Sequence, residues 1–227
     1  MDLISGIHKI MKTSLVSICL SVSLLAPLSA EEAPAKPAGE VDKLQQAAKR
    51  TVALNNMKQI GIVLLEFDTE YGSFPNAETA KDVKEATGTM FKFEGKTSND
   101  YFRQFIASGI LKTEKIFQFG KPAKPADDKF ATEAEALAQG ECDFAYLPGA
   151  TASCEPTRPL VLGPLVPGKM EFDPVPFGGK AVVLRADNSA TVHAINEKGE
   201  VIINGKSLFD PTQEYWEGKK PEVAWPK

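Results

Sequence analysis

Residues 54–75 read LNNMKQIGIVLLEFDTEYGSFP, and this stretch decides the fold. It continues a pattern that starts at Val41, in which one stripe of side chains recurs every three or four residues, as on one face of an α-helix. The stripe consists of Leu44, Ala47, Thr51, Leu54, Met57, Ile60, Gly61, Leu64, Phe67 and Tyr71. Gly72 and Pro75 follow in the order that ends a helix. The sequence therefore predicts a helix of about 30 residues, roughly 45 Å long.

The second half of this helix is apolar on nearly every side. Its residues 60–65 read IGIVLL, with no charged side chain between Lys58 and Glu66. A helix that is apolar all round is usually buried. We therefore expect other parts of the protein to cover the second half of the helix.

The chain after Pro75 predicts a mixed region and then antiparallel strands. Residues 98–100 (SND) offer N-cap chemistry for a short helix. Residues 180–185 and 190–195 form a predicted hairpin around a tight turn at Asp187 and Asn188, and residues 199–204 predict a third strand. The fold class is therefore α+β: a long N-terminal helix packed on an antiparallel sheet. We expect the helix to pack against Val182, Leu184 and Ile202.

Residues 1–30 have the pattern of a secretory signal peptide. Lys9 and Lys12 precede a short apolar run, and APLSA ends the segment at Ala30. Residues 31–40 are rich in Pro and Ala and predict a semi-rigid linker, so the folded domain is expected at 41–227. An uncleaved anchor is the alternative, but the apolar run is short for a transmembrane helix. We expect an exported protein without a membrane anchor, located in the periplasm, at the outer membrane or outside the cell.

Composition excludes some partners and cofactors. The chain has 227 residues, 43% of them hydrophobic and 25% charged, with a formal net charge of -4. This composition is ordinary for a globular protein. No basic patch supports binding to nucleic acid. Neither a phosphate-binding Gly-rich motif nor a zinc-ligand cluster is present in the sequence, so we expect no cofactor and no metal.

Two cysteines, Cys142 and Cys154, remain once Cys19 is removed with the leader. An even pair in an exported protein predicts a disulfide bond. Their spacing is not CxxC and no histidine lies nearby in the sequence, which argues against a redox or metal role.

The polar residues do not form a recognisable catalytic pattern. His193 is the one histidine left after the leader, near Asp187 and Ser189, but a Ser/His/Asp site needs three converging groups. These three lie on turn and strand positions that point to different faces. We therefore interpret His193 as a surface or edge histidine and the protein as non-enzymatic.

Several carboxylates leave alternatives open. Glu66, Asp68 and Glu70 are spaced by two on the predicted helix, so they do not share a face as an acid/base pair would. Asp68 with Glu70, or Asp187 with Asp210, remain candidate calcium ligands, although no EF-hand-like run exists.

Two tryptophans lie late in the chain, at Trp216 and Trp225, in a tail without periodicity. Aromatic residues in such tails are frequent in interfaces and sugar sites, so they are a possible binding surface. The alternative is that the tail folds back and covers the sheet or the helix.

The helix also carries a family resemblance. The stretch AKRTVALNNMKQIGIVLLEFDTEYGSFP resembles the helix and exit loop of type IV pilin-like proteins, and especially the pseudopilin-like proteins of type II secretion. The matching positions are Leu54, Asn55, Asn56, Lys58, Gln59, Ile60, Gly61, Phe74 and Pro75. The predicted hairpin is similar to the family's C-terminal hairpin, with Phe177 in place of a histidine and Asp187-Asn188 in place of Asp-Gly.

One departure from the family pattern concerns the leader. Pilin-like precursors carry a short basic leader ending in Gly, and a Glu follows five residues into the mature chain. Here Thr13 stands in the place of the Gly, and no Glu occurs between Ser14 and Ala30, so a signal peptide replaces the usual leader. The resemblance thus implies the fold more strongly than filament formation. It implies protein–protein interaction in a pilus- or secretion-associated envelope system, and a secreted module that binds a glycan or host surface is the alternative.

Overall fold

The structure is a computed structural model, and it describes residues 38–120, 122 and 124–227. The predicted signal peptide, residues 1–30, and most of the predicted linker lie outside the described residues. Among the described residues, no helix is both long enough and apolar enough to cross a membrane.

The predicted long helix is present as α1, Ala38–Tyr71, with 34 residues. It begins slightly before Val41 and so includes the end of the predicted linker. It ends where the sequence indicates, because Gly72 adopts a φ of 73° and its N–H donates to the Asp68 carbonyl. A left-handed residue that returns its N–H to the last turn is a common helix terminator.

Two shorter helices follow, α2 (Thr79–Thr87) and α3 (Ser98–Ala107). The helix predicted near residues 98–100 is α3, but its N-cap is Thr97, whose side chain accepts a hydrogen bond from the Asp100 N–H while the Asp100 carboxylate accepts from Thr97 N–H. Lys115–Phe117 forms a short 3-10 helix, η1.

One antiparallel sheet contains β1 (Ala145–Tyr146), β2 (Pro159–Gly163), β3 (Lys180–Arg185) and β4 (Ala190–Ala194), in that order. The predicted hairpin is β3–β4, in which Val182 lies opposite Val192. Asn188 has a φ of 62° in the turn, as the predicted tight turn requires. The α+β fold class is thus confirmed.

The predicted third strand is not part of this sheet. Ile202–Ile203 forms β5, which pairs with β6 (Lys206–Ser207) in a separate two-stranded sheet, and η2 (Glu214–Trp216) follows. Only an isolated bridge between Ile195 and Val201 continues from β4. Ile202 is 45% exposed, so the prediction that it packs against the long helix is wrong.

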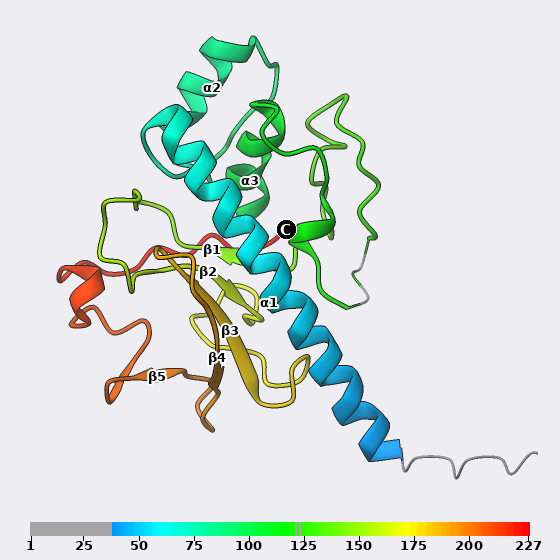
Figure 1. Ribbon diagram of the computed structural model, residues 1–227, viewed down its shortest axis with the longest axis vertical. Coiled ribbons are helices and arrows are strands. Elements are labelled where there is room, and N and C mark those ends of the chain that lie inside the picture. Colours follow the sequence, from blue (N-terminus) through cyan, green and yellow to red (C-terminus); the bar gives the residue numbers. More distant parts are fainter. Residues whose placement is uncertain (1–37, 121, 123) are drawn as a thin grey trace, which may run out of the picture. The chain divides into compact units, whose positions relative to one another are not determined.

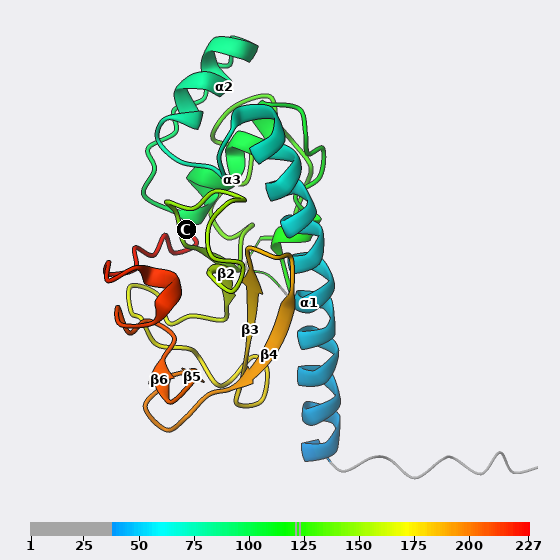
Figure 2. The same cartoon turned by 60° about the vertical axis from the view of Figure 1, so that its left-hand side comes forward.

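The four-stranded sheet is covered on both faces (Figures 1 and 2). Val182 and Leu184 of β3 lie in the same apolar cluster as the inner side of α1. Ala181 and Val183 point the other way, into a second cluster with Phe172, Leu208 and Trp216 from the C-terminal part. The alternation of side chains along a strand places these two sets on opposite faces.

The inner side of α1 is formed by Ala53, Met57, Ile60, Leu64 and Phe67, and all five are fully buried. They recur at spacings of three and four, which keeps them on one helix face. This face packs on β3 and β4, and it also contacts η1 and α2.

Leu64 and Leu65 provide a matched test of this packing. Leu64 is fully buried, whereas its neighbour Leu65 is 37% exposed. We expect Leu64→Ala to lower the free energy of unfolding by about 2–5 kcal/mol, since it leaves a core cavity. Leu65→Ala should cost less than about 1 kcal/mol. Urea denaturation of both variants measures the difference, and equal losses would show that α1 is packed in another orientation.

Gly61 marks the closest approach of α1 to the β3–β4 turn. A Cβ atom at this position would clash with Asn188 Oδ1 and lie 3.2 Å from Leu184 Cδ1. The absence of a side chain at Gly61 therefore lets the helix lie directly on the turn.

A double-variant experiment checks this role of Gly61. Gly61→Ala should destabilise the protein by about 1–3 kcal/mol through overpacking. Asn188→Gly tolerates the positive φ and removes the clashing side chain. In that background Gly61→Ala should become neutral or stabilising, because Ala favours helix over Gly by about 1 kcal/mol. A penalty of the same size in both backgrounds, measured by thermal or urea unfolding, would rule out the contact with Asn188 as its cause.

Candidate interaction surface

The helix α1 exposes a second row of side chains on its outer side, which we call the outer stripe. Its members are Val41, Leu44, Ala48, Thr51, Asn55, Lys58, Ile62 and Leu65, and all of them are exposed. Their spacing alternates between three and four residues, which is the spacing of the contact positions of a coiled coil. The ends of the outer stripe are apolar and its centre is polar.

The exposure of the outer stripe corrects one expectation from the sequence. The second half of α1 was expected to be covered, yet Ile62 is 57% exposed and Leu65 is 37% exposed. Within the described residues, the elements in contact with α1 are chiefly β3, β4, η1 and α2. Figure 2 shows α1 along one edge of the unit, with the sheet on its inner side. The remaining side of the helix therefore carries apolar surface that these elements leave uncovered.

The motif that resembles pilin-like proteins is divided between the two sides of α1. Ile60 and Gly61 are buried and Leu54 is half-buried. Asn56 fastens η1 to the helix, because its Nδ2 donates to the carbonyl oxygens of Lys115 at 3.3 Å and Gln118 at 2.7 Å. Leu54, Asn56, Ile60 and Gly61 therefore contact other parts of the fold.

Of the motif residues within α1, the remaining three, Asn55, Lys58 and Gln59, are exposed. Asn55 and Lys58 belong to the outer stripe. The described residues do not cover Asn55, Lys58 and Gln59. These positions are therefore accessible to a partner.

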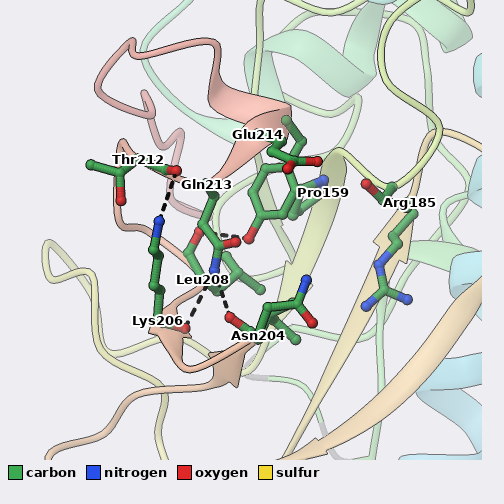
Figure 3. Close-up of a pocket in the computed structure, with 11 residues that line it drawn as sticks. Pro159, Arg185, Asn204, Lys206, Leu208, Thr212, Gln213 and Glu214 are labelled. Carbon is green, nitrogen blue, oxygen red and sulfur yellow. Dashed lines mark hydrogen bonds between the residues drawn. The ribbon is translucent and has the colours of Figure 1, made fainter.

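A small cavity lies on the far side of the sheet, between the ends of β2 and β3 and the β5–η2 segment (Figure 3). Its volume is about 230 Å³, somewhat below the range of roughly 300–1,000 Å³ that is usual for small-molecule sites. Its lining includes Arg185, Asn204, Lys206, Gln213, Glu214 and Tyr215.

Most polar side chains that line this cavity already form hydrogen bonds with other groups of the protein. The Lys206 ammonium donates to the Thr212 carbonyl at 3.2 Å, and the Tyr215 hydroxyl donates to the Leu208 carbonyl at 3.1 Å. Arg185 donates to Thr191 Oγ1 at 2.9 Å. The cavity therefore ranks behind the outer stripe as a functional candidate.

His193 contacts neither Asp187 nor Ser189 through its ring. Its Nε2 lies 2.8 Å from Thr191 Oγ1 and 3.3 Å from an Arg185 nitrogen. Burial, and then the positive charge of Arg185, lower the pKa of His193. The Asp187 carboxylate instead accepts a hydrogen bond from the Ser189 N–H. The structure therefore does not bring these three residues together as a nucleophilic site.

Two of the candidate calcium ligands, Asp68 and Asp210, accept hydrogen bonds from the protein. Asp68 accepts a hydrogen bond from the Ala152 N–H at 3.1 Å. Asp210 accepts from both the N–H and the hydroxyl of Thr212, and these hydrogen bonds lower the pKa of Asp210. The hydrogen bonds of Asp210 close a local turn, whereas the hydrogen bond of Asp68 joins α1 to the loop after β1.

A different group of carboxylates comes together in the structure. Oxygen atoms of Glu114, Asp127 and Glu141 lie within 4.8 Å of one another, and burial raises the pKa of Glu114. The Lys124 ammonium lies 2.7 Å from Glu141 Oε1 and 3.7 Å from Asp127 Oδ2. The shorter contact is an ion pair that lacks hydrogen-bond geometry. Sequence reasoning missed this group because its members are distant along the chain.

The expected disulfide is not present in the structure, where Cys142 and Cys154 are both free thiols. Cys142 is buried, with its Sγ 3.5 Å from Ser98 Oγ and 3.4 Å from the Phe144 carbonyl. Cys154 lies in the loop after β1 and is half-buried.

The tail covers the sheet, which was the alternative to a tryptophan binding surface. Trp216 is 2% exposed, and its Nε1 donates to the Leu208 carbonyl at 2.8 Å. Trp225 is half-buried and donates to the Lys169 carbonyl at 3.1 Å. The prediction of a binding surface at these residues is therefore wrong for Trp216, which belongs to the core.

Comparison with known proteins adds no family assignment, because no family model, no curated protein and no solved structure matches the chain. The resemblance to pilin-like proteins rests on the sequence motifs quoted above, and it stays a hypothesis.

Thiol reactivity tests the state of the cysteines. Burial raises the pKa of the Cys142 thiol to about 12, so little thiolate forms at neutral pH, and thiolate is the reactive species. We expect Cys142 to resist alkylation in the native protein and Cys154 to react faster. Both should react after denaturation without reductant, as read by peptide mass spectrometry. Protection of both until a reductant is added would restore the disulfide prediction.

Proposed function

We propose that this chain is an exported, non-enzymatic, pilin-like protein that acts through protein–protein contacts in a pilus- or secretion-associated system of the cell envelope. The observation that carries the proposal is the outer stripe of α1. Exposed apolar side chains that gather on one side of a protein, bordered by polar residues, commonly mark an interaction site.

The apolar members of the outer stripe are well placed for a partner. Leu44 is 50% exposed and Ile62 is 57% exposed, and Val52, 45% exposed, lies beside the stripe. They project from one continuous helix, so they need no rearrangement to form a contact. An amphipathic helix face that inserts into an apolar groove or against another helix is a common recognition mode.

The remaining parts of the proposal come from the sequence. Export follows from the signal-like pattern of residues 1–30, and the envelope system follows from the resemblance of the α1 motif to pilin-like proteins. A periplasmic, outer-membrane-associated or secreted location is compatible with both. The alternative of a glycan-binding module loses its main support, because Trp216 is buried and most polar groups of the small cavity are bound internally.

Site-specific photo-crosslinking in the producing cell tests the proposal. A photo-reactive residue at Ile62 should crosslink this chain to a protein, because Ile62 is the most exposed apolar residue of the outer stripe. Met90, which is 90% exposed and lies after α2, is the matched control. We expect a defined crosslinked band from Ile62 and none from Met90. No product from Ile62, with the protein exported and folded, would refute the proposed interaction role.

A further inference from the structure

We infer that the occupant of the outer stripe is the outer stripe of a second copy of this chain, packed antiparallel. The inference rests on the proposed function, since it names the partner of the same helix face. Its support comes from the order of residues along the stripe, their exposure and their charges.

The order of residues is self-complementary when two copies run in opposite directions. Around a two-fold axis near position 53, each early position of one copy meets a late position of the other. The resulting pairs are Val41 with Leu65, Leu44 with Ile62, Ala48 with Lys58, and Thr51 with Asn55. Apolar residues thus meet apolar residues at both ends, and polar residues meet at the centre.

The flanking residue Val52 fits the same arrangement. Val52 is 45% exposed on α1 and has no place in the core. Because it lies next to the two-fold axis, it would contact Val52 of the second copy. The antiparallel register therefore gives a partner to each exposed apolar residue of the helix between Val41 and Leu65.

Charge distinguishes the antiparallel arrangement from the parallel one. In a parallel pair every residue faces itself, so Lys58 would face Lys58 in the middle of the seam, and like charges at such positions are destabilising. In the antiparallel pair Lys58 lies over the small side chain of Ala48. Its alkyl stem can then cover apolar surface while its ammonium reaches water.

The position of α1 also permits this contact. Figure 2 shows α1 at one edge of the described unit, with the sheet on its inner side. Two copies can therefore meet along their outer stripes with both sheets facing outward.

The size of the seam predicts a weak, reversible dimer. Twenty-five residues at about 1.5 Å each give a strip of roughly 37 Å, and a helix is about 10 Å wide, so the footprint is roughly 370 Å² per copy. A standard stable interface buries about 800 Å² per partner. We therefore expect dissociation constants in the range of about 10–500 µM.

Sedimentation equilibrium of the protein as isolated from the producing cell, across this concentration range, tests the inference. Leu44→Lys and Ile62→Glu should each weaken the dimer about 10-fold or more, because each places a charge against an apolar partner. The double variant, Leu44→Lys with Ile62→Glu, should recover most of the affinity, since it forms two opposite-charge pairs across the antiparallel seam. Met90→Glu is the control for added surface charge and should leave the dimer unchanged. Circular dichroism melting checks that every variant is folded.

The outcomes separate this inference from the proposed function. A double variant weaker than either single variant would point to parallel packing and overturn the antiparallel register. A wild-type chain that stays monomeric throughout the range would overturn self-association. If Ile62 nevertheless crosslinks to a different protein in the cell, the proposed interaction role survives while this inference fails. A crosslink between two copies supports both.

Discussion

The contact between the inner side of α1 and strand β3 is the constraint on which the rest of the structure depends. Ile60 and Leu64 are buried in the same apolar cluster as Val182 and Leu184, and Gly61 lets the helix axis come close to the β3–β4 turn. Burial of large apolar side chains contributes about 1.5–3 kcal/mol each, so this contact contributes several such increments to the stability of the long helix. Most of the stability of a helix in a protein comes from its tertiary packing, and helix propensity alone contributes little.

Because α1 covers one face of the sheet, the other face needs its own cover. The C-terminal segment provides it through Leu208, Tyr215 and Trp216, which pack on Ala181 and Val183. The polar atoms of the two aromatic residues are satisfied by one carbonyl, that of Leu208. This arrangement explains why the tail is rich in aromatic residues although it lacks any periodicity. It also removes the reason to regard Trp216 as a ligand-binding residue.

The same helix that organises the core also presents the main candidate for function. Its inner positions are occupied by the protein itself, while Leu44, Ile62 and Leu65 are left on the surface. The motif around residues 54–61 reflects both roles: Asn56, Ile60 and Gly61 hold neighbouring elements, and Asn55 and Lys58 point outward. One helix segment can thus serve core packing on one side and remain accessible to a partner on the other.

The sequence by itself determined the elements whose signals are local. The helix to Tyr71, its end at Gly72 and the β3–β4 hairpin follow from periodicity and turn chemistry within a few residues. Only the tertiary structure decided which surfaces meet. It placed Ile202 in a separate sheet, left Cys142 and Cys154 as free thiols, gathered Glu114, Asp127 and Glu141 from distant segments, and left Ile62 uncovered. These outcomes depend on contacts between residues that are distant in the sequence. Apolar periodicity predicts that a helix has a buried face, but it does not predict which element packs against that face.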